Sequence, residues 1–306
     1  MPDKPTNVID CKAIADSIKV ELTKQVTLLG ERGVVPRLAI ILAGDDAASE
    51  TYVRGKLRDG EEIGIFADLH RIPIDADTND PEVGARVTAE IRALIDRLNA
   101  DPVVDGMILQ LPVPPGVDED SLIQAVLPAK DVDGLHPRNH GLIMQGSPHF
   151  LPATPHAVQQ ILVRSGHDPG GKHVVIVGRS RLVGLPLAIM LVQKRAGANA
   201  TVTLCHTGTP DLAGYTRAGD IVIAAAGVPA LITGEMVRDG AVVIDVGINR
   251  VDDTSRKRGY RIAGDVDFDS VQPKVAAITP VPGGVGLMTR VMLLTNVVRA
   301  ARSRLT

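Results

Sequence analysis

The sequence predicts an α/β protein of two domains, each built around a parallel sheet. Short apolar runs alternate with stretches of helical period, which is typical of repeated strand and helix units. The alternation loosens between residues 135 and 155, where Gly, Pro, Asn and His are frequent, and then resumes. A length of 306 residues also exceeds what a single hydrophobic core usually serves.

The first half is predicted to contain helices and strands in alternation. Apolar residues recur every three or four positions after Asp10 and after the turn Asn79-Asp80-Pro81, as in amphipathic helices with capped starts. Apolar runs bounded by Pro and Gly are typical of strands buried on both faces. We expect helices over 10–30, 46–63 and 81–98, and strands over 37–44 and 103–112.

The second half repeats the pattern more strongly. Thr154-Pro155 is expected to start a helix that runs to about Ser165. Apolar strands are expected over 173–178, 200–206, 220–227 and 241–248, with helical connections, which favours a doubly wound, Rossmann-like fold. A last helix from about Leu287 is expected to return to the first domain. The predicted bounds are 1–150 and 283–306 for the first domain and 151–282 for the second.

Composition excludes several classes of protein. Aromatic residues are only 2% of the chain and the net charge is -3, so a nucleic-acid partner is not expected. Cys11 and Cys205 belong to no metal-ligand or redox spacing, and no cluster argues for a metal. No apolar run reaches the ~18 residues of a membrane span, and the N-terminus has no signal-like core. We expect a cytoplasmic protein without a metal or a membrane partner.

The stretch VVIVGRSRLVG, residues 174–184, indicates a dinucleotide site. Gly178 ends a strand and Gly184 begins a helix, so backbone amides at the helix start can face a pyrophosphate. The next strand ends in CHTGT, without the acid that usually holds the ribose of NAD. Arg179, Ser180, His206 and Thr207 can instead donate to a 2′-phosphate, which favours NADP. Alternatively, Arg179 is a solvated loop residue and His206 a polar strand end.

The helix SETYVRGKLRDGEEIG carries a candidate catalytic group. Ser49, Tyr52 and Lys56 share one side of it, at offsets of 3 and 7. We expect Arg54 and Arg58 to lower the pKa of the lysine by like-charge repulsion. From this helix alone, an exposed charged face is the favoured alternative.

Other candidates follow the strands. Gln110 ends an apolar strand, where active sites of parallel sheets collect, and its amide can bind Lys56 or a ligand carbonyl. Asp131 and Asp133 of KDVDG lie in a loop. Such acids often only cap turns, yet one that faces a cleft can bind a planar, nitrogen-rich ring. TPVPGGVG either turns the chain or lets backbone approach a ligand.

Taken together, these segments resemble the bifunctional methylenetetrahydrofolate dehydrogenase/cyclohydrolase family. The matching stretches are TYVRGK, DGMILQLPVP, KDVDG, VVIVGRSRLVGLP, VVIDVGIN, GDV and TPVPGGVG, in the family's order over residues ~49–289. The resemblance implies a folate-binding first domain and an NADP-binding second domain. It also implies NADP-linked oxidation of 5,10-methylenetetrahydrofolate, hydrolysis of the methenyl product to 10-formyltetrahydrofolate for one-carbon metabolism and purine biosynthesis, and a homodimer.

The resemblance also assigns residues. It implies that Lys56 is central to hydrolysis, that Tyr52 lies against the folate, that Gln110 tunes the lysine and that Asp133 grips the pterin. The implied substrate contacts are Ser49, Tyr52, Leu109, Leu111, Asp133, Pro282, Gly283, Gly284, Val285 and Gly286. The implied cofactor contacts are Gly178, Arg179, Ser180, Thr207 and Ile248.

The sequence departs from the family's pattern at Arg58, Ala153, Ala157 and Leu287, which bears on the balance between the two activities. The segment VQKRAGANAT looks a few residues long, and we expect it to affect a surface connection only. Two other functions stay open: a dehydrogenase of this fold without hydrolysis, and a non-catalytic NADP-binding protein.

Overall fold

The computed structural model describes residues 6–256 and 259–305, and it confirms the predicted α/β class with parallel sheets. By contacts the chain divides into two units. Unit 1 holds the residues up to Ser17 and Thr154–Thr289, and unit 2 holds Ile18–Ala153 and the residues from Arg290 on. Residues 6–17 and 283–289 therefore group with the second half of the chain, unlike in the predicted bounds. The chain enters unit 1 after Ala153, within the stretch where the pattern loosens.

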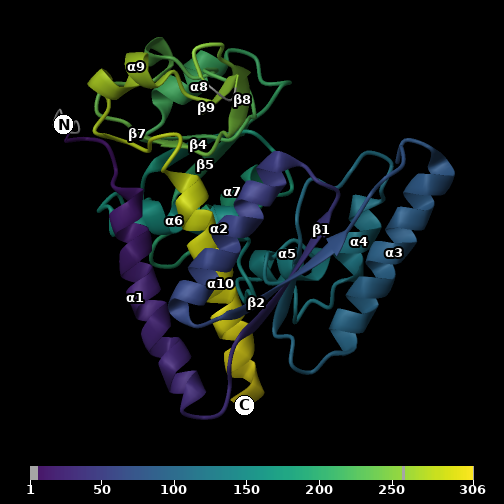
Figure 1. Ribbon diagram of the computed structural model, residues 1–306. Coiled ribbons are helices and arrows are strands. Elements are labelled where there is room, and N and C mark those ends of the chain that lie inside the picture. The colour runs from purple at the N-terminus through teal and green to yellow at the C-terminus, as the bar shows by residue number, and fades with distance from the viewer. Residues whose placement is uncertain (1–5, 257–258, 306) are drawn as a thin grey trace. The chain divides into compact units, whose positions relative to one another are not determined.

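Unit 2 contains a parallel sheet in the order β2-β1-β3. The odd-numbered apolar residues of β1 pack with α3 and α4 into one buried cluster (Figure 1). The even-numbered ones are equally buried on the opposite face. The strands are β1 (Arg37–Ala43), β2 (Phe66–Ile72) and β3 (Gly106–Leu109), and the helices are α2 (Ala47–Ile63), α3 (Pro81–Ala100), α4 (Glu119–Ala125) and α5 (Pro137–Met144).

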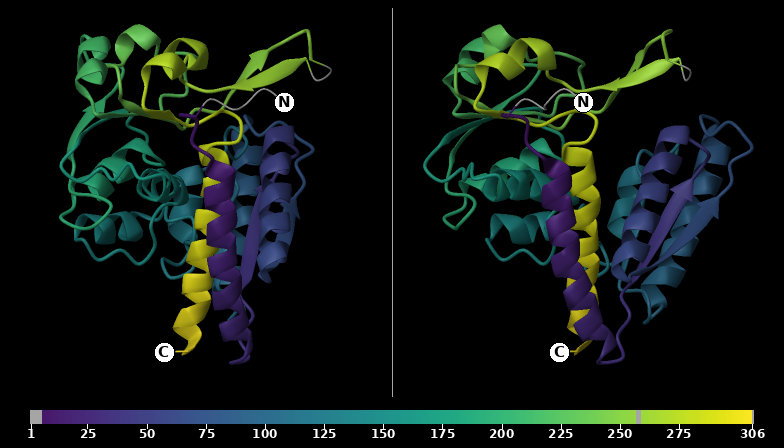
Figure 2. Two further views of the ribbon diagram at one scale, coloured as in Figure 1. Left: turned by 90° about the vertical axis from the view of Figure 1, so that its left-hand side faces the viewer. Right: turned by 60° about the vertical axis from the view of Figure 1, so that its left-hand side comes forward.

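Two helices contribute to both units, because the division falls within each. They are α1 (Cys11–Gly30) and α10 (Val285–Arg302). In unit 2 their later turns lie side by side (Figure 2), and Arg302 Nη2 donates to Gln25 Oε1 at 2.9 Å. Gly60 of α2 faces Leu294 of α10. The sequence predicts that the last helix returns to the first domain. In the structure, only its residues from Arg290 on group with unit 2.

Unit 1 contains a parallel sheet in the order β10-β7-β6-β4-β5, with α8 and α9 on one face and α6 and α7 on the other (Figures 1 and 2). Helices on both faces are the doubly wound arrangement that the sequence predicts. The strands of this sheet are β4 (His173–Val177), β5 (Thr201–Cys205), β6 (Ile221–Ala224), β7 (Val242–Asp245) and β10 (Ala277–Ile278). The helices are α6 (Ala153–Arg164), α7 (Gly184–Val192), α8 (Leu212–Ala218) and α9 (Phe268–Val271), and β8 (Asn249–Asp252) and β9 (Tyr260–Ala263) form an antiparallel hairpin.

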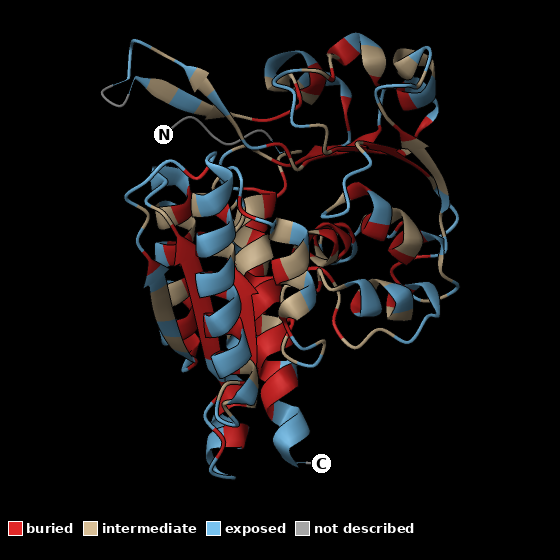
Figure 3. Cartoon of the chain, turned by 90° about the vertical axis from the view of Figure 1, so that its right-hand side faces the viewer, coloured by how far each residue is buried: buried red, intermediate tan, exposed pale blue. Residues whose placement is uncertain are grey.

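Buried residues follow the two sheets (Figure 3). Elements that the sequence analysis missed have less apolar character. The edge strand β2 reads FADLHRI and is mostly exposed or half-buried, so it lacks the apolar run that marked its neighbours. Helix α5 did carry a start signal, because His136 accepts from the Arg138 backbone amide and Pro137 is the first helical residue.

The expectation of a purely surface connection over VQKRAGANAT is wrong. Gly197 and Ala198 are buried there. The buried Gln159 of α6 donates through Nε2 to the Gly197 carbonyl at 2.7 Å. One backbone polar group thus fixes the middle of this connection to the core of unit 1.

The turn between β4 and α7 requires glycine at both ends. Gly178 has a φ of +122°, and a Cβ there would lie 2.0 Å from the Ala225 carbonyl oxygen. A Cβ at Gly184 would lie 1.9 Å from the Gly178 carbonyl oxygen. The turn therefore closes on itself too tightly for any side chain at these two positions.

Replacing Gly184 by Ala is expected to lower the free energy of unfolding by about 2 kcal/mol or more, because backbone must move to admit the methyl group. Gly141 of α5 is the matched control, since a Cβ there meets nothing within 4 Å. Gly141→Ala is expected to be neutral or stabilising by up to about 1 kcal/mol. Urea unfolding followed by circular dichroism checks both, and equal losses would contradict the steric explanation.

Candidate active site

Helix α2 places Lys56 in the interior of unit 2. The helix is capped by Asp46, whose carboxylate accepts from the Ser49 backbone amide at 2.7 Å. Its buried positions recur at intervals of three and four: Ser49, Val53, Lys56, Gly60 and Ile63. Because Lys56 is only 8% exposed, the alternative of an exposed charged face is wrong for this residue.

Gln110 holds the lysine amine. It follows β3 directly, and its backbone amide donates to the Ile41 carbonyl at 2.8 Å. Lys56 Nζ donates to Gln110 Oε1 at 2.9 Å, and Gln110 Nε2 donates to the Leu111 carbonyl at 2.7 Å. The second bond orients the amide, so its oxygen faces the amine. A neutral amine held in this way keeps a lone pair for a proton.

The two acids of KDVDG have different environments. Asp131 is buried, and its carboxylate accepts from the backbone amides of Gly134, Leu135 and His136 and from Asn139 Nδ2, at 2.7–3.1 Å. Burial raises the pKa of this carboxyl to about 6. In the described part of the chain, no group donates a hydrogen bond to the half-buried carboxylate of Asp133. Asp131 therefore shapes the loop, and Asp133 retains its capacity to accept.

The sheet brings Asp133 to the edge where Gln110 lies. The chain before Asp133 runs parallel to β3, since Met107 N donates to the Lys130 carbonyl at 2.8 Å and pairs with Asp131. Gly134 turns the chain there with a φ of +77°, and a Cβ would lie 2.8 Å from Pro152 backbone. The Ala153 amide donates to the Asp133 carbonyl at 3.2 Å. The glycine of this motif thus permits the close approach that fixes Asp133.

Burial and charge act together on these groups. Burial lowers the pKa of Lys56, while Asp133 raises it and Arg290 lowers it. Burial raises the pKa of Asp133, against the charge of Lys56. Burial also raises the pKa of Tyr52, against the charge of Arg290. The site therefore favours a neutral amine more than water does.

The expectation that Arg54 and Arg58 lower the pKa of Lys56 is wrong. Both are exposed, and Arg58 points to Asp59. The cation that acts on Lys56 is Arg290 of α10. No pattern within α2 could have identified it, because Arg290 and the Asp59 that binds it are 231 positions apart.

The remaining predicted substrate residues are divided between the apolar cluster of unit 2 and a loop of unit 1. The Leu109 side chain is buried in the apolar cluster of unit 2, so only its backbone is available to a ligand, and Leu111 packs against the same cluster. The segment Pro282–Gly286 belongs to unit 1. Gly283 has a φ of +100°, and a Cβ there meets nothing, whereas a Cβ at Gly284 would lie 2.3 Å from the Pro280 carbonyl oxygen.

The four residues that depart from the family's pattern differ in burial. Ala153 and Ala157 are buried in α6, Leu287 is half-buried in α10, and Arg58 is exposed on α2.

The predicted cofactor residues gather at the carboxyl edge of the sheet in unit 1. Val177 is in register with Cys205, so Arg179 and Thr207 each lie two positions beyond that pair. Both are exposed. Ser180 Oγ accepts from the Val183 amide at 3.1 Å, which leaves its hydroxyl hydrogen to donate. Ile248 is exposed beyond β7, two strands from β4.

The loop after β5 suits an anion. The Gly208 amide donates to His206 Nδ1 at 3.0 Å, so the neutral imidazole carries its hydrogen on Nε2 and can donate there. The nearest acid in sequence, Asp211, accepts from the Gly214 amide and caps α8. These residues fit a 2′-phosphate, because the donors remain available and the acid is engaged.

The motifs VVIDVGIN and GDV bind each other. Asp245 accepts from the backbone amides of Asp265 and Val266, and Asp265 accepts from those of Ala226 and Gly227. Burial raises the pKa of Asp245 to about 6. These acids therefore fix the loops beyond β6 and β7.

Over 6–256 and 259–305 there is no group of three or more His, Cys, Asp or Glu side chains placed to hold a metal ion. Among the helices of that same part of the chain, none combines the length and apolarity needed to cross a bilayer.

Models of two family domains match the chain. The tetrahydrofolate dehydrogenase/cyclohydrolase catalytic domain matches residues 9–133, and the NAD(P)-binding domain of the same family matches residues 152–305. The chain belongs to the tetrahydrofolate dehydrogenase/cyclohydrolase family. This confirms the resemblance on which the residue assignments rest.

Individual relatives match the chain over almost its whole length. The bifunctional protein FolD of Salinibacter ruber is 49% identical over 307 residues, covering 100% of this chain and 99% of the relative. That of Halobacterium salinarum is 51% identical, covering 97% and 96%. A structure of the Trypanosoma brucei dehydrogenase-cyclohydrolase, complexed with NADP and an inhibitor, has a TM-score of 0.88 at 38% identity and covers 100% and 99%.

Replacing Asp131 by Ala is expected to lower the free energy of unfolding by about 3 kcal/mol, because three backbone amides and Asn139 lose their buried acceptor. Asp133→Ala is the matched change in the same loop and is expected to cost less than about 1 kcal/mol, because that carboxylate accepts no such bonds. Urea titration of both variants checks this. A larger loss in Asp133→Ala would contradict the division of roles.

Proposed function

We propose that the chain oxidises 5,10-methylenetetrahydrofolate with NADP and hydrolyses the 5,10-methenyl product to 10-formyltetrahydrofolate. The observation that carries the proposal is the buried Lys56 amine, held by Gln110 and facing Asp133, in a member of this family. When bound, NADP would supply the acceptor for the hydride that leaves the substrate. The remaining chemistry falls to side chains of unit 2.

Hydrolysis of the methenyl product needs a base and no further electrophile. Hydride loss leaves an amidinium cation on the substrate, which water can attack. A neutral Lys56 amine repels this cation less than an ammonium does, and its lone pair can take the proton of the attacking water. The C–N5 bond of the water adduct then breaks, and N5 takes up the proton that the lysine ammonium returns. Gln110 fixes the amine by accepting one of its hydrogens. The hydrogen bond thus fixes the orientation of the Lys56 amine before water binds.

The substrate itself is proposed to lie along the exposed side of this group. The Asp133 carboxylate can accept from ring N–H groups of the pterin, since no described residue occupies it. Tyr52 is half-buried one turn before Lys56 and can lie against the ring. Ser49, Leu111 and the backbone of Leu109 complete the proposed contacts in unit 2.

The nucleotide is proposed to bind at the carboxyl edge of the sheet in unit 1. Gly178 and Gly184 allow the phosphate-binding turn, and the start of α7 offers its amides. Arg179, Ser180 and Thr207 are proposed to bind the 2′-phosphate, with Ile248 against another part of the cofactor.

Assembly and location are also proposals. We propose a homodimer, and the edge strand β2 with its exposed Phe66 offers a surface for a second copy. We place the enzyme in the cytoplasm, where it would supply one-carbon units for purine biosynthesis. The free Cys11 and Cys205 are buried with raised pKa values, as suits thiols that stay reduced.

Lys56→Met is expected to lower the rate of methenyl hydrolysis by about 100-fold or more, since the proposed base is removed. Lys24→Met removes an exposed lysine and is the control. The assay follows loss of methenyltetrahydrofolate absorbance in each variant. Unchanged hydrolysis in Lys56→Met would refute the role of this residue and leave the dehydrogenase alternative.

Arg179→Ala is expected to raise KM for NADP about tenfold, because a charged hydrogen bond to the 2′-phosphate is lost, and to leave KM for NAD unchanged. Arg217→Ala, an exposed arginine of α8, is the control. Nucleotide reduction with tetrahydrofolate, formaldehyde and either cofactor measures both constants. A wild-type preference for NAD would refute the 2′-phosphate assignment.

A further inference from the structure

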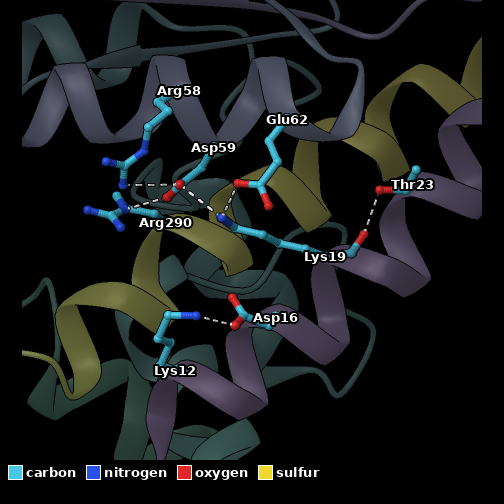
Figure 4. Close-up of polar contacts among 8 residues, drawn as sticks. All are labelled: Lys12, Asp16, Lys19, Thr23, Arg58, Asp59, Glu62 and Arg290. Atoms are coloured by element: carbon cyan, nitrogen blue, oxygen red, sulfur yellow. Dashed lines mark hydrogen bonds and ion pairs between the residues drawn. The ribbon is translucent and has the colours of Figure 1, made fainter.

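Arg290 joins α10 to the catalytic helix α2 through a buried ion pair. Its Nε donates to Asp59 Oδ2 at 2.6 Å (Figure 4). The Arg290 side chain is 15% exposed and that of Asp59 only 1%. A pair this buried holds its geometry closely, since either charge alone would be costly to desolvate.

The charges around Asp59 do not cancel. Lys19 Nζ lies 3.0 Å from Asp59 Oδ1 and 2.7 Å from Glu62 Oε2, and Arg58 Nη2 lies 3.5 Å from Asp59 Oδ1 (Figure 4). Three cations thus share two carboxylates, which leaves one net positive charge. Asp59 anchors Arg290 without removing the positive field of the cluster.

Gly55 admits the guanidinium to the surface of α2. A Cβ at this position would lie 2.6 Å from Arg290 Nη1 and 3.1 Å from its Cζ. Any side chain at Gly55 would therefore displace the group. Gly55 precedes Lys56 by one residue and follows Tyr52 by three, so the guanidinium is held against the part of the helix that carries both.

We propose that Arg290 is a positioning residue for the hydrolytic step: anchored by Asp59 and admitted by Gly55, it keeps a permanent positive charge beside Lys56 and so favours the neutral amine. The proposal rests on the proposed role of Lys56 as base. An arginine suits this purpose because it stays protonated at every pH at which the enzyme works.

The groups that face Lys56 give the direction of the effect. Gln110 after β3 is neutral, Tyr52 on α2 has a pKa raised by burial, Asp133 in its loop raises the pKa of Lys56, and Arg290 lowers it. Removing the arginine charge therefore raises the pKa of Lys56. At a given pH less of the amine is then neutral.

The test compares Arg290→Met with the wild-type enzyme in two measurements. The first is the pH dependence of kcat for methenyl hydrolysis, whose acid limb is expected to move up by about one unit, with about a tenfold lower rate on that limb. The second is the reaction of Lys56 with acetic anhydride at graded pH, read by mass spectrometry of its peptide. It reports the pKa of the amine independently of turnover.

Controls separate charge from structure. Arg290→Lys keeps the charge and is expected to restore most of the acid limb, and Arg302→Met removes an arginine from the end of the same helix and is expected to change neither measurement. If Arg290→Met does not fold, Arg290→Gln removes the charge but keeps a donor for Asp59.

Two outcomes would overturn the inference: an unmoved Lys56 titration in a folded charge-free variant, or a loss of kcat equal at every pH. A Lys56 titration that shifts as expected in an enzyme whose wild type does not hydrolyse the methenyl substrate would instead refute the proposed function and leave the effect of Arg290 standing.

Discussion

Burying the Lys56 amine away from water costs free energy unless nearby groups form hydrogen bonds with it or stabilise its neutral form. The residues around α2 in unit 2 do both. Gln110 accepts one N–H, and its own amide is oriented by backbone. Asp133 and Arg290 act on the amine with opposite signs. The two charges come from different elements, so the fold sets the balance between them. The proposed role of Lys56 as a base depends on that balance.

Hydrogen bonding decides which of two nearby acids is available for chemistry. Asp131 and Asp133 are two positions apart, and burial raises the pKa of both. Asp131 accepts four bonds from its own loop, so it holds that loop in shape. Asp133 lies within the turn that Gly134 ends, and it acts electrostatically on Lys56. In unit 1, by contrast, Asp245 and Asp265 both accept from backbone amides, so both hold loops in shape.

Close backbone approach is the other recurring constraint. At Gly178 and Gly184 it forms the turn where we propose that a phosphate binds, and at Gly134 it fixes the loop of Asp133. At Gly55 it makes room for a guanidinium instead. Each glycine is required by what lies against it, and in two of these places the neighbour comes from a distant part of the chain. A glycine in a helix such as α2, which weakens the helix locally, is explained only by that neighbour.

The sequence by itself determined the alternation of strands and helices, the glycine turn, the absence of an acid after β5 and the motifs shared with the family, because these depend on local spacing and residue type. It did not predict β2, whose edge position leaves it with little apolar character. Nor could it show that Lys56 is buried, since α2 reads as a charged helix. Only the tertiary structure decided that Arg290, rather than Arg54 or Arg58, acts on Lys56, because burial and long-range contacts set which charges a buried amine experiences.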